Sequence, residues 1–278
     1  MSIGYYQKAI DLAPDQDFYY LFLGRSLLEK AQSLSDASQR EALIQRSLNI
    51  LKQAQALNPL NTDHTANLGR LHRIWAQSVS DPQRREQLFN ASLEYYAQAT
   101  RLSPRNAGLF NERGLVYYLM GRYDDAMAQY EESFKLDQQF DQTYLLVGDI
   151  YLARQDYEGA AAAYRRAAEL SPNSAQAHSA LGYTYAQLGR FAEAITENLT
   201  VLRMTPDDYI TLRNLALLYQ QAGQYTEALK TAELALPRAP EKERVPLQQL
   251  IEQLKASLGR PASPTTQPRP TPAPTATK

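Results

Sequence analysis

A turn signal recurs at fixed intervals along most of the chain, and it constrains the fold more than any other feature of the sequence. The segments that carry it end at Pro14, Pro59, Pro104, Gln138, Pro172, Pro206 and Pro240, so the steps between them are 45, 45, 34, 34, 34 and 34 residues. A fixed period of about 20 to 50 residues indicates stacked copies of one small structural unit. The spacing therefore predicts a repeat protein.

The residues between these turns also repeat. Each of the last four repeats carries a small residue, then a tyrosine, then alanine in the second half; in the fourth repeat these are Gly148, Tyr151 and Ala160. Small residues let two helix backbones approach closely, and tyrosine fills the gaps between neighbours. A glycine near mid-repeat, such as Gly189, suits the left-handed conformation that ends a helix.

This pattern and the 34-residue period resemble the tetratricopeptide repeat family. The resemblance implies an all-α fold, a right-handed superhelical solenoid of antiparallel helix pairs. The expected parts, in chain order, are a half repeat or capping helix at 1–16, two long repeats at 17–106, four 34-residue repeats at 107–240, a capping helix at 241–258 and a disordered tail at 259–278. The tail is rich in proline and threonine and has almost no large apolar residue, so it cannot bury enough surface to offset its ordering entropy.

The two long repeats share an insertion of about eleven residues relative to the 34-residue period. Asp36 and Asp81 stand at equivalent places in it, and Pro82 follows the second of them. Aspartate before a helix and proline at its first position are N-terminal signals. The insertions therefore predict a lengthened second helix in each long repeat. Either they only extend the helices outward, or they form a docking ledge.

Composition excludes several kinds of chemistry. The net charge is −1, so no overall positive field favours nucleic acid. The chain has no cysteine, and its three histidines, His64, His72 and His178, have no carboxylate pair at metal-binding spacing. The sequence contains no run of about 18 apolar residues, the length that a helix needs to cross a membrane. We expect no metal, no cofactor, no catalytic residue and no direct membrane insertion. The chain is therefore expected to bind another protein and not to act as an enzyme.

In the tetratricopeptide architecture the first helix of each pair lines the inner face, where a protein or peptide binds. The exposed positions of those helices predict a partner-binding groove formed by Arg25, Asn67, Arg70, Arg73, Asn111, Glu112, Tyr118, Asp149, Tyr183, Arg213 and Asn214. Arg25, Arg70 and Arg73 lie in the long repeats and suggest a preference for an acidic segment. Alternatively, these arginines are solvated or pair with local carboxylates.

The segment from Asn58 to Leu71, with Trp75 after it, resembles the C-terminal helical-repeat region of bacterial O-antigen ligase or polymerase-like membrane proteins. That resemblance implies an upstream membrane domain holding the transferase residues, with this chain as an accessory binding domain tethered to the inner membrane. The side of the membrane stays open. The alternative is a free-standing cytoplasmic scaffold. The partner's identity and the oligomeric state are not encoded in any motif of the sequence.

Overall fold

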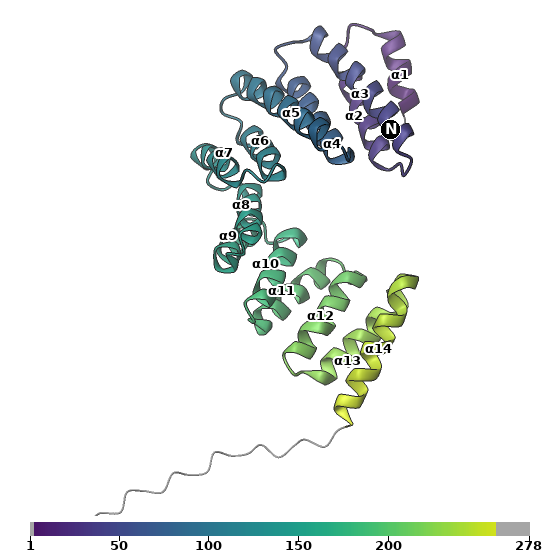
Figure 1. Cartoon of the computed structure of the whole chain (residues 1–278), viewed down its shortest axis with the longest axis vertical. Helices are drawn as coiled ribbons and strands as arrows, with labels where there is room; N and C mark the ends of the chain where they lie inside the picture. The colour runs from purple at the N-terminus through teal and green to yellow at the C-terminus, as the bar shows by residue number, and fades with distance from the viewer. Residues whose placement is uncertain (1–2, 260–278) are drawn as a thin grey trace, which may run out of the picture. The chain divides into compact units, whose positions relative to one another are not determined.

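The computed structural model describes residues 3–259, and within that range the regular structure is helical, with no strand. The prediction of an all-α fold built from helix pairs is confirmed. The described residues form two compact units, one up to residue 177 and one from residue 178 onward. Figure 1 shows that each unit is a run of neighbouring helices joined by short turns.

The first unit holds helices α1 to α9 and the start of α10. Successive helices pack on each other as antiparallel pairs, α2 on α3, α4 on α5, α6 on α7 and α8 on α9. Their bounds are α1 Ile3–Leu12, α2 Asp17–Gln32, α3 Ala37–Leu57, α4 Thr62–Ser78, α5 Pro82–Leu102, α6 Ala107–Leu119, α7 Tyr123–Leu136, α8 Asp141–Ala153 and α9 Tyr157–Leu170.

The insertions lengthen both helices of the long repeats. Helices α3 and α5 have 21 residues each, whereas α7 and α9 have 14. Helices α2 and α4 have 16 and 17 residues, whereas α6 and α8 have 13. As predicted, Asp36 and Asp81 are N-caps: Asp36 accepts a hydrogen bond from the backbone N–H of Gln39, and Asp81 accepts from Arg84. Each cap satisfies an N–H that the first helical turn leaves without a partner.

A glycine in the first helix of a pair faces a tyrosine ring from the second. A Cβ built at Gly114 would lie 2.3 Å from Cε1 of Tyr130, and one at Gly148 would lie 2.4 Å from Cε1 of Tyr164. Gly69 stands in the same way against Tyr96. All three rings are fully buried or nearly so. The missing side chain of each glycine therefore makes room for an aromatic core residue.

The turn inside each short repeat has one residue in the left-handed region. Gly121, Gly189 and Gly223 have φ angles of 74°, 72° and 74°, which confirms the role predicted for Gly189. Gln155 occupies the corresponding place in the fourth repeat, with φ 60°. A side chain with a Cβ adopts this conformation at a cost that glycine avoids.

The second unit begins within α10 (Ala175–Gln187) and continues through α11 (Phe191–Met204), α12 (Tyr209–Gln221), α13 (Tyr225–Ala235), a short 3-10 turn (Leu236–Arg238) and α14 (Glu241–Leu258). Helix α14 packs on α13 and buries Leu247, Ile251 and Leu254 in a core shared with Leu212. Val245, on the same helix, is 59% exposed.

Two predictions concern membranes and the C-terminal tail. None of the helices within residues 3–259 is both long enough and apolar enough to span a membrane. The predicted disordered tail falls, from residue 260 onward, outside the described residues.

Candidate functional site

Arg70 and Arg73 on α4 meet a carboxylate from the next first helix. Arg70 Nη2 donates to Glu112 Oε1 at 2.8 Å, and Arg73 Nη2 lies 3.6 Å from Glu112 Oε2. The hydroxyl of Tyr96 donates to the same Oε2 at 2.9 Å. Burial alone would raise the pKa of Glu112, but the two guanidinium groups and the Tyr96 hydrogen bond hold it below its ordinary value. These arginines therefore pair with a local carboxylate, the second of the two alternatives above.

Two predicted groove residues have side chains that lie inside the repeats. Asn67 is 8% exposed, and its Nδ2 donates to the carbonyl of Asp63. Asn111 is 3% exposed, and its Nδ2 donates to Oγ1 of Thr143 at 2.9 Å. The repeat pattern correctly predicts that both residues lie on first helices. Their side-chain amides, however, are buried and hydrogen-bonded within the first unit, so a partner cannot reach them.

Arg25, Tyr118 and Asp149 keep accessible surface in the first unit. Arg25 is exposed and has no ion-pair partner within residues 3–259. Tyr118 is half-buried, with its ring centroid 5.6 Å from that of Tyr123. Asp149 is also half-buried and accepts a hydrogen bond of 2.6 Å from the Tyr164 hydroxyl. Of these three, Asp149 is the only one that has a hydrogen-bond partner in a neighbouring helix within residues 3–259.

The remaining predicted groove residues, Tyr183, Arg213 and Asn214, lie in the second unit, but they do not all line the same surface. Arg213 points to α14: its Nη1 is 3.4 Å from Glu243 Oε2, which also accepts from the Tyr209 hydroxyl at 3.5 Å. Tyr183 on α10 and Asn214 on α12 instead line a common hollow. The structure therefore brings Tyr183 and Asn214 together and turns Arg213 away from them.

This hollow, here called the α10–α12 groove, has a volume of about 480 Å³. Its wall includes three unusually exposed apolar side chains, Tyr183 (54% exposed), Ile210 (59%) and Leu217 (40%). The amides of Asn214, Gln187 and Gln221 lie among them. An exposed apolar surface rimmed by polar groups is typical of a site that another molecule covers.

The floor of the α10–α12 groove explains why it is open. Gly182 and Asn198 both line it, and a Cβ built at Gly182 would lie 2.7 Å from Nδ2 of Asn198. Asn198 follows Tyr96, Tyr130 and Tyr164 at the same 34-residue spacing. Asparagine is much smaller than tyrosine, so less side chain fills this position than in the first unit, although Asn198 is itself 7% exposed and its Nδ2 donates to the carbonyl of Ala194 at 2.8 Å. Sequence reasoning missed this residue, although the break in the tyrosine series signals it.

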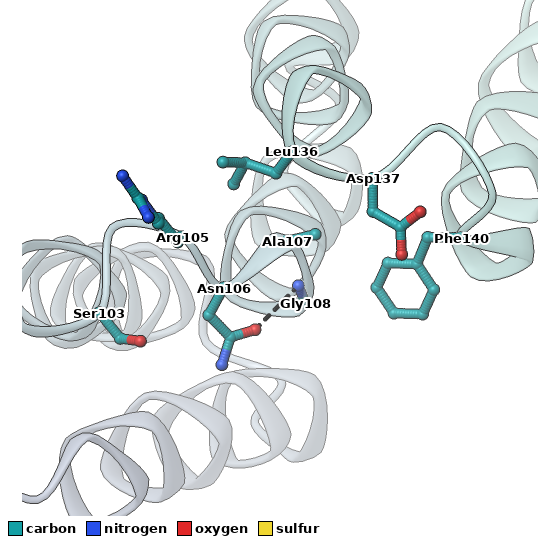
Figure 2. Close-up of a pocket in the computed structure, with 8 residues that line it drawn as sticks. All are labelled: Ser103, Arg105, Asn106, Ala107, Gly108, Leu136, Asp137 and Phe140. Carbon is teal, nitrogen blue, oxygen red and sulfur yellow. Dashed lines mark hydrogen bonds between the residues drawn. The ribbon is translucent and has the colours of Figure 1, made fainter.

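Other hollows lie at helix ends in the first unit. One, of about 580 Å³, is lined by Ser103, Arg105, Asn106, Ala107, Gly108, Leu136, Asp137 and Phe140 (Figure 2). None of these residues was predicted to bind a partner. The amide of Asn106 is already engaged, since its Oδ1 accepts from the N–H of Gly108 at 3.1 Å, as the dashed line in Figure 2 shows. This hollow is lined by residues at helix ends and in turns, and they do not form a cluster of polar groups typical of a binding site.

Another of these hollows, of about 350 Å³, lies between the two insertions. Trp75 Nε1 donates to Glu41 Oε2 at 2.7 Å, and the guanidinium of Arg84 lies over the Trp75 ring at 5.4 Å from its centroid while also pairing with Glu41. These contacts join the two long repeats to each other. They favour the reading in which the insertions extend the helices, and the docking ledge stays a prediction.

Comparison with known families agrees with this geometry. Residues 107–140, 175–208 and 211–244 match models described as tetratricopeptide repeat, and residues 148–189 match one described as TPR repeat. The chain contains tetratricopeptide repeats. No curated protein matches it in sequence.

Solved tetratricopeptide proteins share the fold. A thermophilic TPR protein of Thermus thermophilus, TTC0263, is 21% identical with a TM-score of 0.57, and the match covers 66% of this chain and 89% of that one. YrrB, a TPR protein with an unusual peptide-binding site, is 18% identical with a TM-score of 0.52, over 74% and 97% of the two chains. Yeast Tom70 is 14% identical with a TM-score of 0.61, over 92% and 58%. At these identities the likeness shows the fold alone.

The tetratricopeptide fold indicates a scaffold for protein–protein interaction, and proteins with these repeats are generally not enzymes. No group of three or more histidine, cysteine, aspartate or glutamate side chains within residues 3–259 could hold a metal ion.

Proposed function

We propose that this chain binds a segment of another protein, with the α10–α12 groove of the second unit as its principal contact and no catalysis of its own. The observation that carries the proposal is the cluster of exposed Tyr183, Ile210 and Leu217 around the groove. Aromatic and apolar anchors that enter or line a pocket supply most of the energy of a protein interface. The amides of Asn214 and Gln221 can hydrogen-bond the guest's backbone, so the guest is a segment with apolar side chains.

Two leucines of the second unit provide a matched test. Leu217 on α12 lines the groove, whereas Leu199 on α11 does not, and both are 40% exposed. Affinity capture from the cells that make the protein is carried out with wild type, Leu217→Lys and Leu199→Lys. We expect Leu217→Lys to weaken capture about tenfold or more, since burying an unpaired ammonium costs more than about 1.4 kcal/mol. Leu199→Lys should capture as wild type does, and equal partner recovery by all three proteins would contradict the proposal.

A finer proposal concerns the setting in which binding occurs. The resemblance of Asn58 to Leu71 to the repeat region of O-antigen ligase-like proteins supports an accessory domain of a bacterial cell-envelope glycan-assembly protein, attached to a membrane domain. The alternative is a free-standing cytoplasmic adaptor. The genomic reading frame upstream of the Met1 codon tests the two: continuation into several apolar segments supports membrane attachment, and a start signal directly at Met1 supports the adaptor.

A further inference from the structure

The side chains that line the α10–α12 groove offer apolar surface and almost no charge. Tyr183 and Leu217 are exposed, and the half-buried Phe191 adds a second aromatic ring to the wall. Asp208 is the only charged residue among the described residues that line the groove. Its Oδ2 accepts a hydrogen bond of 2.8 Å from the backbone N–H of Thr211, as the N-cap of α12. Ion pairs therefore contribute little to holding a guest here.

Side-chain amides supply the hydrogen-bond donors of the groove. Asn214 is half-buried, and Gln187 and Gln221 are exposed; all three line the groove. Each amide group offers two N–H donors in addition to its accepting oxygen. The groove therefore suits a segment that presents apolar side chains together with carbonyl oxygens that have no partner of their own.

The chain contains such a segment directly after α14, residues 260–278, here called the C-terminal segment. It includes six prolines, and four of them alternate with other residues from Pro268 to Pro274. Proline has an apolar ring and no N–H, so a proline-rich segment has more backbone acceptors than donors. Such sequences favour the polyproline II conformation, whose carbonyls make no hydrogen bonds within the segment. Grooves lined by aromatic rings bind such segments at a low cost in ordering entropy.

The charges of the segment and the groove are compatible. The charged side chains of the C-terminal segment are Arg260, Arg269 and Lys278, all positive, and it has no aspartate or glutamate. The one charged residue of the groove, Asp208, is a carboxylate. No pair of like charges therefore opposes docking.

The C-terminal segment is also long enough to reach the groove within the second unit. Helix α14 packs on α13, and α13 packs on α12 (Figure 1). Neighbouring helices lie about 8–10 Å apart and a helix of this length spans about 20 Å, so the far end of α12 lies within roughly 30 Å of the end of α14. A polyproline II segment spans about 3.1 Å per residue, so about ten residues cover this distance. Pro268–Pro274 begins ten residues after Leu258, where α14 ends.

We propose that the C-terminal segment, through Pro268–Pro274, occupies the α10–α12 groove of its own chain until a partner displaces it. The proline rings pack on Tyr183 and Leu217, and the amides of Asn214 and Gln221 donate to carbonyls of the segment. The segment thereby removes the exposed apolar surface of the groove from water. The inference rests on the proposed function, because segment and partner compete for one groove, and it makes partner binding subject to regulation by the chain itself.

Weak docking is sufficient because the segment is attached to the unit that it covers. A short flexible connection gives an effective concentration of about 1 mM. A segment that binds with a dissociation constant of about 1 mM therefore covers the groove in about half of the molecules. A partner then binds about twofold more weakly than it would bind an open groove.

The test places a spin label in the C-terminal segment. Because the chain has no cysteine, Ala276→Cys provides a single attachment site two residues beyond Pro274. The isotope-labelled full chain is compared by NMR with the label paramagnetic and with the label reduced. We expect the backbone amides of residues 183, 210 and 217 to lose intensity in the paramagnetic state, since an unpaired electron broadens the signals of nearby nuclei. A large excess of unlabelled chain should leave this loss unchanged, because docking within one molecule is independent of concentration.

Two changes in the spin-labelled chain should abolish the loss of intensity. Leu217→Lys replaces an apolar side chain of the wall by a cation that also repels Arg269. The second is a combined variant that removes the alternating proline rings, Pro268→Ser with Pro270→Ser, Pro272→Ser and Pro274→Ser. Leu199→Lys is the control, since Leu199 is as exposed as Leu217 and lies outside the groove. Without the spin label, the combined variant should bind the captured partner about twofold or more tightly than wild type does. Circular dichroism confirms that each variant is folded.

Three outcomes would overturn the inference: full intensity at residues 183, 210 and 217, a loss that persists in the combined variant, or a loss that falls on dilution with unlabelled chain. The last of these would assign the groove to the segment of a second copy. The proposed function is tested separately. If Leu217→Lys captures partners as wild type does while the label still broadens the groove signals of the otherwise unchanged chain, the proposed function is wrong and the docked segment stands. If capture depends on Leu217 and the label leaves these signals unchanged, the reverse holds.

Discussion

The same structural position is filled in the first unit and open in the second. In the first unit, Tyr130 and Tyr164 fill the space beside Gly114 and Gly148. In the second unit, Asn198 stands beside Gly182, and both line a hollow of about 480 Å³. The helix pairs around the two positions are otherwise alike, with second helices of 14 residues in α7, α9 and α11. At Asn198, the departure from the repeated tyrosine therefore coincides with the α10–α12 groove.

The largest effect should come from emptying a filled position. Tyr164→Ala removes a ring that is 1% exposed, and we expect it to cost about 3 to 5 kcal/mol, as large-to-small changes at buried aromatics do. Because each repeat contacts only its neighbours, hydrogen exchange of α8 and α9 amides should report the loss more directly than global melting. Asn198→Ala is the matched change in the second unit. If it destabilised α10 and α11 by a similar amount, the distinction between filled and open positions would fail.

The tyrosine hydroxyls at the filled positions should contribute different amounts to the free energy of unfolding. Tyr96→Phe removes a hydrogen bond to the ionised Glu112 and should lower the free energy of unfolding by about 1.5 to 3 kcal/mol. Tyr130→Phe removes a hydroxyl that has no partner within residues 3–259, so its effect should be close to zero or slightly stabilising. Urea unfolding monitored in the first unit compares the two. Equal losses would mean that the Tyr130 hydroxyl has a partner.

The open position can be closed by a single change. Asn198→Tyr places in the second unit the residue that the spacing of Tyr96, Tyr130 and Tyr164 would predict. A ring against Gly182 should fill the floor of the α10–α12 groove and weaken the capture of a partner about tenfold, or about 1.4 kcal/mol. Affinity capture beside wild type measures this. Normal binding by a folded Asn198→Tyr chain would show that the guest does not use the floor of the groove.

The sequence alone was enough to predict the helix pairs, the caps at Asp36 and Asp81 and the left-handed Gly189, because each of these is fixed by a few neighbouring residues. The burial of Asn67 and Asn111 and the pairing of Arg70 with Glu112 were not predicted as such. The Arg70–Glu112 contact joins residues 42 positions apart on different helix pairs. Register shows which helix carries a residue, but the neighbour's side chains decide whether its surface remains free.

The smallest expected effect tests how uniform the repeats are. Gln155 has φ 60° at the turn position that Gly121, Gly189 and Gly223 occupy in the other short repeats. Gln155→Gly should stabilise the first unit by roughly 1 kcal/mol, since it removes the cost of a Cβ in the left-handed region, partly offset by the added freedom of the unfolded chain. Gly189→Gln, the reverse change in the second unit, should destabilise by a similar amount. The free energies of unfolding of both variants check this. No gain from Gln155→Gly would mean that contacts of the Gln155 side chain, which the glycine turns lack, stabilise this turn.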